Sequence, residues 1–258
     1  MSWVKNGIST TGFWRRVRRR FILHVVKAPT GLVLALLTNV AHAEPRVVLD
    51  PGHGGSNPGA KGAGLLEKQL TLGLANQIAE RLRARGVTVE LTRSDDRTLT
   101  LRQRVAFANA APADLFVSIH ANASPTRTQH GYETFVLTPR GIDVDARALR
   151  SDTRTPRFGI DGDIALVLDD LERGASQLHA ASLAARIQRN LRERRGKEGD
   201  RGVRQDAHHV LLGATMPAVL VEVGFLDHPL EGKELATPEV QAQLADAIAG
   251  SIVDQLAD

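Results

Sequence analysis

Two histidines and two glutamates occupy positions from which they could carry out metal-assisted hydrolysis. His53 follows the segment VVLDPG and His120 ends the segment DLFVSIH, so each histidine is predicted to lie at the end of a strand. Glu67 follows GAKGAGLL and opens a predicted helix, while Glu222 lies inside the otherwise apolar AVLVEVGFL. Two histidines and one carboxylate, with a fourth position left for water, are the usual ligands of a catalytic zinc ion, and a second carboxylate would then serve as proton shuttle.

Each of these four residues also has a structural explanation. His53 could cap a turn, His120 could be a hydrogen-bonded core histidine, and Glu67 could be an ordinary acid favoured by the helix dipole. Glu222 is harder to explain in this way, because a carboxylate in an apolar strand is costly without a partner. Other motifs are weaker: GHGG lacks the Lys-Ser/Thr of a phosphate-binding loop, GAKGAG does not open a helix in the dinucleotide pattern, and Ser118 beside His120 lacks a third triad member.

The spacing of these residues requires a fold that brings distant segments together. Strands are predicted at Arg46–Asp50, Val87–Thr92, Leu115–His120, Tyr132–Thr138, His209–Leu212 and Ala218–Val223. Helices are predicted at Glu67–Arg85, Leu101–Ala110, Gly174–Arg195 and Pro238–Gln255. This alternation predicts an α/β fold in a single domain, with a mostly parallel sheet covered by helices on both faces. Arg140–Asp163, rich in Gly, Asp, Arg and Pro, predicts a long loop.

The positive charge of the chain is concentrated in residues 1–43. The chain has 33 Lys/Arg and 29 Asp/Glu, and this segment holds seven of the basic residues and none of the acidic ones. The remaining 26 basic and 29 acidic residues give the rest of the chain a net charge of about −3. We therefore expect no nucleic-acid partner.

Residues 1–43 have the layout of an export signal peptide. A basic region precedes the apolar run Gly31–Val40, and Ala41-His42-Ala43 forms a small-x-small cleavage site. The run is shorter than the ~20 residues of a spanning helix, so we expect no stable membrane insertion after cleavage. Arg18–Leu23 resembles a twin-arginine signal, although a general secretory signal has the same composition. The mature protein is predicted to be in the periplasm or cell envelope, without disulfides because the chain has no cysteine.

Six segments together resemble one family. They are VVLDPGHGGSNPGAKG, LLEKQLTLGLA, GVTVELTRSDD, LRQRVAFANAAPADLFVSIHANA, GYETFVL and MPAVLVEVGFLDHPLE. In order and spacing they are similar to the bacterial zinc-dependent N-acetylmuramoyl-L-alanine amidases that cut peptidoglycan, and the match covers nearly all of Glu44–Asp258. The resemblance implies a catalytic domain at 44–258 with a twisted, mostly parallel sheet of about six strands. It also implies that His53, Glu67 and His120 bind Zn²⁺ and that Glu222 is the catalytic acid/base.

The activity implied by the resemblance is hydrolysis of the amide bond between the lactyl group of N-acetylmuramic acid and L-alanine. Such cleavage serves wall remodelling, daughter-cell separation or autolysis. Asn122 could donate to the substrate or simply form a turn. Residues near strand ends that remain structural or substrate-facing are His130, Glu133, His208 and His209. We expect no separate wall-binding module.

A regulatory insertion is a further possibility at residues 140–173. Some related amidases plug the zinc site with a helical insertion until an activator protein binds. Here Asp163–Glu172 could form a helix whose acids, Asp169, Asp170 and Glu172, occupy the open zinc position, or a surface helix with solvated acids. Two other functions stay open: a periplasmic zinc amidohydrolase of small N-acyl amino acids, and a non-catalytic wall-binding module, which the intact Glu222 disfavours.

Overall fold

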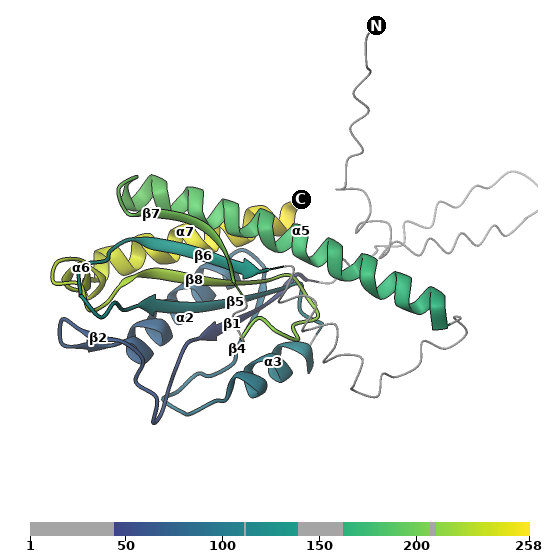
Figure 1. Cartoon of the computed structure of the whole chain (residues 1–258), viewed down its shortest axis with the longest axis horizontal. Coiled ribbons are helices and arrows are strands. Elements are labelled where there is room, and N and C mark those ends of the chain that lie inside the picture. The colour runs from purple at the N-terminus through teal and green to yellow at the C-terminus, as the bar shows by residue number, and fades with distance from the viewer. Residues whose placement is uncertain (1–43, 111, 139–161, 207–209) are drawn as a thin grey trace, which may run out of the picture. The chain divides into compact units, whose positions relative to one another are not determined.

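The central feature of the fold is one six-stranded sheet (Figure 1). The structure is a computed structural model that describes residues 44–110, 112–138, 162–206 and 210–258, with residues 162–170 and 173 described by their backbone alone. The strands are β1 (Arg46–Pro51), β4 (Thr88–Leu91), β5 (Leu115–Asn122), β6 (Tyr132–Leu137), β7 (Asp200–Asp206) and β8 (Ala218–Phe225). Their order is β4-β1-β5-β8-β6-β7, and β6 runs antiparallel to β8 while every other neighbouring pair is parallel. The predicted α/β fold with a mostly parallel sheet is confirmed.

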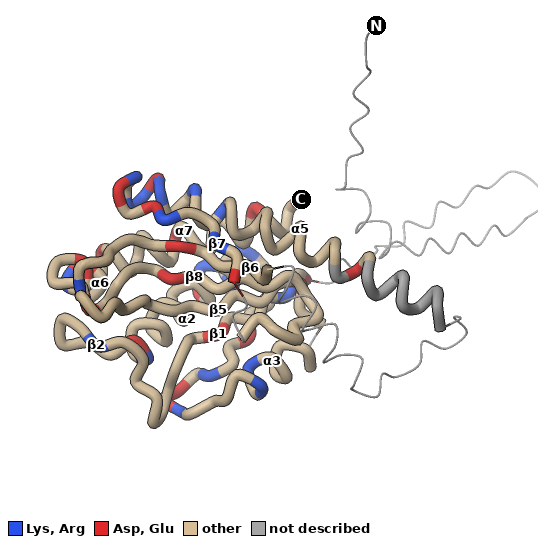
Figure 2. Tube along the Cα trace, in the orientation of Figure 1, with Lys and Arg blue, Asp and Glu red and all other residues tan. Residues whose placement is uncertain are grey.

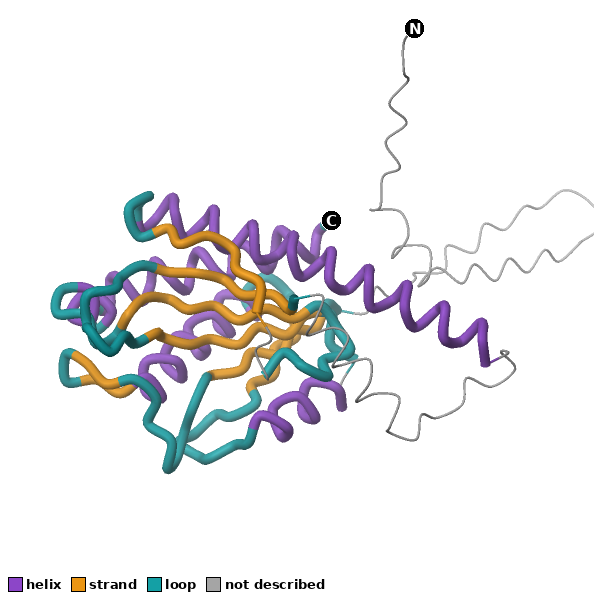
Figure 3. The backbone as a smooth tube through the Cα atoms, viewed as in Figure 1, coloured by secondary structure: helices purple, strands orange, loops and turns teal. Residues whose placement is uncertain are grey.

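Helices cover both faces of this sheet. They are α2 (Glu67–Arg83), α3 (Leu101–Ala110), α5 (Gly162–Arg195), α6 (Glu231–Leu235) and α7 (Pro238–Ala257). Helices α2, α5 and α7 share one core with side chains such as Val47 and Val117, whereas α3 packs in a second core with Val48 and Phe116. The α5 and α7 helices run side by side, and α3 stands apart from them (Figures 1 and 3). Successive strand residues therefore face opposite layers, as the pleat of a strand requires.

Helix α2 shows how the sequence dictates one of these contacts. Every fourth residue from Leu70 to Leu82 is apolar and at most 2% exposed, so the helix buries one stripe against the sheet. Burial of each such side chain stabilises the fold by about 1.5–3 kcal/mol. After the helix ends, Gly86 adopts a φ of +75°, which a residue with a side chain rarely adopts, and turns the chain into β4. Because α2 is held against the sheet by this stripe, its first residue, Glu67, has a fixed position.

Three sequence predictions need correction: one strand, the start of one helix, and the end of the loop before that helix. The strand predicted at His209–Leu212 is wrong for its described part: residues 210–213 form a turn, and Val210 and Leu211 pack in the core that contains α3. The helix predicted to begin at Gly174 begins at Gly162, so it takes in the segment 163–172 and the end of the predicted loop. The rest of that loop, and His208 and His209, lie outside the described residues.

Several elements were not predicted. The edge strand β7 has the sequence DRGVRQD, which has no apolar alternation because none of its residues is fully buried and its last four are exposed. The strands β2 (Lys61–Gly62) and β3 (Leu65–Leu66) form a short antiparallel hairpin just before α2. Both features depend on pairing with neighbours more than on local composition.

Residues 44–257 form one compact unit. Among the helices that the structure describes, none combines the length and the apolar character needed to cross a bilayer. The predicted signal peptide, residues 1–43, and most of the predicted insertion at 140–173 lie outside the described residues.

Candidate active site

The sheet places three polar residues named in the sequence analysis side by side on neighbouring strands. His120 on β5 is paired with Glu222 on β8, and Glu222 is paired with Glu133 on β6. Residues paired in this way on adjacent strands point to the same face of the sheet. His120 and Glu222 both lie close to the carboxyl ends of their parallel strands, where open α/β sheets place their binding sites.

His53 reaches the same place from the loop after β1. It has a φ of +58°, in the left-handed region that residues other than glycine seldom adopt. The loop passes so close to the ring of His120 that a Cβ on Gly52 would lie 2.4 Å from it. At Gly59, which has a φ of +66°, a Cβ would lie 2.3 Å from Oε2 of Glu67. These two glycines allow the backbone to approach the side chains of the site.

Glu67 joins the two histidines into one cluster. Its Oε1 lies 3.0 Å from Nε2 of His53 and 2.9 Å from Nδ1 of His120. One ligand atom from each of the three residues lies within 4.8 Å of the others. The same carboxylate accepts hydrogen bonds from the backbone amides of Ala60 (2.8 Å) and Ala121 (3.0 Å), which fix its orientation. The structure thus brings together the three residues that the sequence predicts as metal ligands.

The donor set of this cluster fits a metal ion. Nδ1 of His53 lies 3.0 Å from Oδ1 of Asn57, so that nitrogen is engaged and Nε2 is left to face Glu67. A polar partner on the second ring nitrogen is the usual companion of a metal-binding histidine. Two imidazole nitrogens and one carboxylate oxygen suit a transition metal such as zinc or iron. Asn57 was missed by the sequence analysis, although its position four residues after His53 is a local signal.

The charges of the site shift the pKa values of its members. Burial alone would raise the pKa of Glu67, but hydrogen bonds and charge from His120 and His53 outweigh it and hold that pKa well below its usual range. Burial alone would lower the pKa of His120. The hydrogen bond to Glu67 and the negative charge of Glu222 outweigh burial, so the pKa of His120 is raised. Glu67 is therefore ionised over the whole physiological pH range.

Glu222 has the environment of a proton-transfer group. Burial is the main cause that raises its pKa to about 7, and the negative charges of Glu67 and Glu133 add to it against the opposing charge of His120. Its Oε2 is buried and has no hydrogen-bond partner among the described residues. A carboxyl group with a pKa near the working pH can both accept and return a proton.

Asn122 and Ser118 are engaged with other side chains. Asn122 donates from Nδ2 to Oε1 of Glu133 at 3.0 Å, and its Oδ1 accepts from the amide of Ala123. Ser118 donates to Oδ2 of the buried Asp50 at 2.7 Å, which gives it a structural role in place of a nucleophilic one. His130 is away from this cluster and packs against the ring of His228, with centroids 5.6 Å apart.

Two buried arginines, which the sequence analysis missed, hold the loop that carries His53. Arg93 donates to the carbonyls of Pro51 (3.0 Å) and Gly52 (2.8 Å). Arg104 donates to the carbonyls of Pro51 (2.7 Å) and His53 (2.6 Å) and pairs with Asp50 at 2.7 Å. Both arginines are at most 3% exposed. The position of His53 therefore depends on side chains from two other segments.

Comparison with known proteins places the chain in a family. Residues 47–254 match the family model described as N-acetylmuramoyl-L-alanine amidase. The chain is 33% identical over 236 residues to the N-acetylmuramoyl-L-alanine amidase AmiA of Escherichia coli (strain K12), covering 84% of this chain and 81% of that protein. This chain belongs to the N-acetylmuramoyl-L-alanine amidase family and is an amide hydrolase.

Solved structures agree with this assignment. The crystal structure of N-acetylmuramoyl-L-alanine amidase from Clostridium difficile 630 is similar with a TM-score of 0.64 and 28% identity, covering 83% of this chain and 98% of that one. The CwlD amidase from Clostridioides difficile, solved in complex with the GerS lipoprotein, is similar with a TM-score of 0.64 and 26% identity, covering 83% and 99%. The six-stranded α/β architecture is thus shared with amidases of this family.

Proposed function

We propose that this protein hydrolyses the amide bond between the lactyl group of N-acetylmuramic acid and L-alanine in peptidoglycan. The observation that carries the proposal is the joining of His53 and His120 by one oxygen of Glu67, with Glu222 paired to His120 on the next strand. Membership of the amidase family supplies the bond class, and this geometry supplies a complete set of groups for breaking it.

We further propose that the metal is zinc and that His53, Glu67 and His120 hold it. A zinc ion bound there would supply a Lewis acid that polarises the scissile carbonyl and acidifies the attacking water. The chain's own contribution is to orient the ligands. Asn57 fixes the ring of His53, and the amides of Ala60 and Ala121 fix the carboxylate of Glu67.

Glu222 is the proposed acid/base. Its carboxylate accepts a proton from water as the hydroxyl group adds to the lactyl carbonyl carbon. It then returns the proton to the nitrogen of L-alanine as the carbon–nitrogen bond breaks. Water is thereby divided between the two products, and Glu222 ends in the state in which it began. Its buried, unpartnered oxygen and its raised pKa support this role.

The decisive experiment is digestion of purified peptidoglycan sacculi with the zinc-loaded mature protein, followed by mass spectrometry of the released ends. We expect free amino-terminal L-alanine and intact lactyl groups, with no release by Glu222→Gln. Release of other ends would contradict the proposal. Cleavage of small N-acyl amino acids without any action on sacculi would favour the alternative amidohydrolase, and binding to sacculi without cleavage would favour a wall-binding module.

We also propose that the protein acts outside the cytoplasm, in the periplasm or cell envelope, after removal of residues 1–43. The peptidoglycan substrate and the layout of that segment support this location. An activator protein is a further proposed partner, supported by the complex of the CwlD amidase with the GerS lipoprotein. Detection of a mature amino terminus at Glu44 in an envelope fraction would test the location.

A further inference from the structure

We propose that Arg201 and Arg204 on β7 form a binding site for a carboxylate of the stem peptide, on the side of the scissile bond that leaves with L-alanine. This inference rests on the proposed peptidoglycan substrate and adds a specificity site to it. Neither arginine belongs to the metal cluster or to the proton-transfer group.

The two arginines converge on one buried carboxylate. Nε of Arg201 lies 3.1 Å from Oε2 of Glu133, and Nε of Arg204 lies 3.4 Å from the same oxygen. The other oxygen of Glu133 accepts the hydrogen bond from Asn122. Glu133 is only 4% exposed, and two guanidinium charges share its single negative charge. These three side chains together therefore carry one excess positive charge. Figure 2 shows that basic and acidic residues both occur on β7 and the strands beside it.

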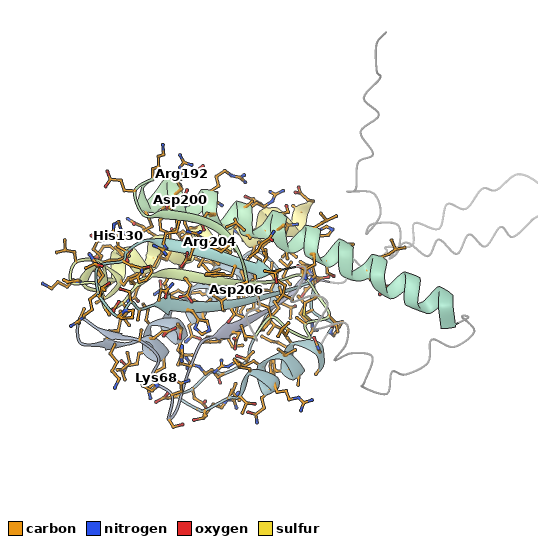
Figure 4. All side chains as sticks on the ribbon, viewed as in Figure 1. Lys68, His130, Arg192, Asp200, Arg204 and Asp206 are labelled. Carbon is orange, nitrogen blue, oxygen red and sulfur yellow. The ribbon has the colours of Figure 1, made fainter. Side chains whose placement is uncertain are left out.

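The guanidinium groups are accessible to a ligand, although the carboxylate beneath them is not. The Arg201 side chain is 29% exposed, and its position is set by the Phe225 ring, 5.0 Å from the guanidinium carbon, and by a hydrogen bond from Nη2 to Gln129 at 3.3 Å. The Arg204 side chain, labelled in Figure 4, is 52% exposed. A planar guanidinium binds a carboxylate through two parallel hydrogen bonds, which suits this pair to an anionic group of the substrate.

The distance from the proposed reaction centre matches the length of a short peptide. Strand β7 lies two strands beyond β8, which is about 10 Å in a sheet. Both guanidinium groups reach back from β7 to Glu133, whose pairing partner is Glu222. An extended peptide advances about 3.3–3.6 Å per residue, so a carboxylate on the residue after L-alanine falls roughly 7 Å from the scissile nitrogen. That residue in peptidoglycan is D-glutamate, whose α-carboxyl group is either free or amidated.

Two substrates that differ only in this group distinguish binding of the α-carboxylate by Arg204 from a purely structural role of Arg204. The substrates are N-acetylmuramoyl-L-Ala-D-Glu-L-Lys and its D-isoglutamine counterpart, in which the α-carboxylate is an amide. We expect Arg204→Gln to lower kcat/KM for the free acid about tenfold, mainly by raising KM. The kcat/KM for the amide should change less than about twofold. Arg204→Lys should recover part of the loss, because lysine restores the positive charge but not the two parallel N–H donors of the guanidinium.

The matched control is Arg192→Gln on α5, also labelled in Figure 4, whose side chain is 49% exposed and lies 3.7 Å from Asp200. It should leave both substrates unaffected. Equal loss on the two substrates in Arg204→Gln, or wild-type values on both, would overturn the subsite while leaving the amidase activity intact. Failure of the wild-type enzyme on both substrates and on sacculi would overturn the proposed function and the subsite together.

Discussion

Arg104 donates a hydrogen bond from Nη2 to the backbone carbonyl of His53 at 2.6 Å, so a helix on one side of the sheet fixes a proposed metal ligand. His53 has a left-handed backbone conformation, which costs about 1–2 kcal/mol for a residue with a side chain. Contacts from its surroundings must compensate for that cost. The pairing of Arg104 with buried Asp50 makes this contact part of the core.

Substitution of Arg104 by Met should weaken both folding and metal binding. Removal of one partner leaves the carboxylate of Asp50 buried without its cation, which costs about 3–5 kcal/mol. Urea unfolding would measure this loss, and competition with a chelator would measure metal affinity. Arg97→Gln, at a half-exposed arginine, is the control and should change neither.

A double variant separates stability from positioning. Asp50→Asn with Arg104→Met removes both buried charges, so it should recover much of the unfolding free energy. Metal affinity should stay low, because the carbonyl of His53 still lacks its donor. Recovery of wild-type metal affinity in the double variant would show that Arg104 acts only through stability.

His53→Ala and His120→Ala should each lose the metal together with activity. Each substitution removes one of three protein ligands, and the carboxylate of Glu67 loses one of the nitrogen partners that share its Oε1. Metal content after dialysis, measured by atomic absorption, checks the outcome. Full metal stoichiometry in His120→Ala would remove that residue from the ligand set.

The sequence predicted the proposed metal ligands better than the residues that hold them in position. Each of His53, Glu67 and His120 alone has an ordinary structural explanation, and they were recognisable because two strand ends and one helix start together supply the ligand set of a zinc site and match a family pattern. Arg93 and Arg104 were missed because arginine is almost always exposed, and burial of a charge depends on partners distant in sequence. The strand β7, with its arginines, was missed because none of its residues is fully buried, so its sequence shows no apolar alternation.

Glu222→Gln should retain the metal and the fold while losing about 10²–10⁴ in rate, the usual contribution of a positioned general acid or base. Glutamine has nearly the same shape but cannot accept a proton from water. Turnover on a muramoyl peptide and metal content, measured on the same preparation, check both halves of the expectation. Near-normal turnover would make Glu222 structural.

The hypothesis that residues 140–173 restrain the site predicts higher basal activity when the restraint is removed. Deletion of Gly141–Asp161, or single substitutions of Asp169, Asp170 and Glu172, should then raise sacculus hydrolysis in the absence of any activator. Circular dichroism would establish that each variant is folded. Unchanged or lower activity in all four would leave these acids as a solvated helix surface.

The raised pKa of Glu222 predicts a pH dependence of stability in the metal-free protein. Its pKa is about 7 in the folded chain, against a usual value of 4.5, because burial disfavours the charged form. The contribution of this carboxyl to stability is therefore complete below pH 4.5 and is lost as the pH rises through 7. The total loss is about 3 kcal/mol, since each pKa unit corresponds to about 1.4 kcal/mol.

Urea unfolding of the metal-free protein at pH 5 and pH 8 would measure this effect against Glu222→Gln, which cannot ionise. The free energy of unfolding of the wild-type protein relative to the variant should be lower at pH 8 than at pH 5 by most of this amount. The other titrating groups are common to both proteins, but the charge of Glu222 raises the pKa of His120, so the difference reports the Glu222 carboxyl together with its coupling to His120. An equal pH dependence in the two proteins would show that this carboxyl ionises in the folded chain as readily as in the unfolded one.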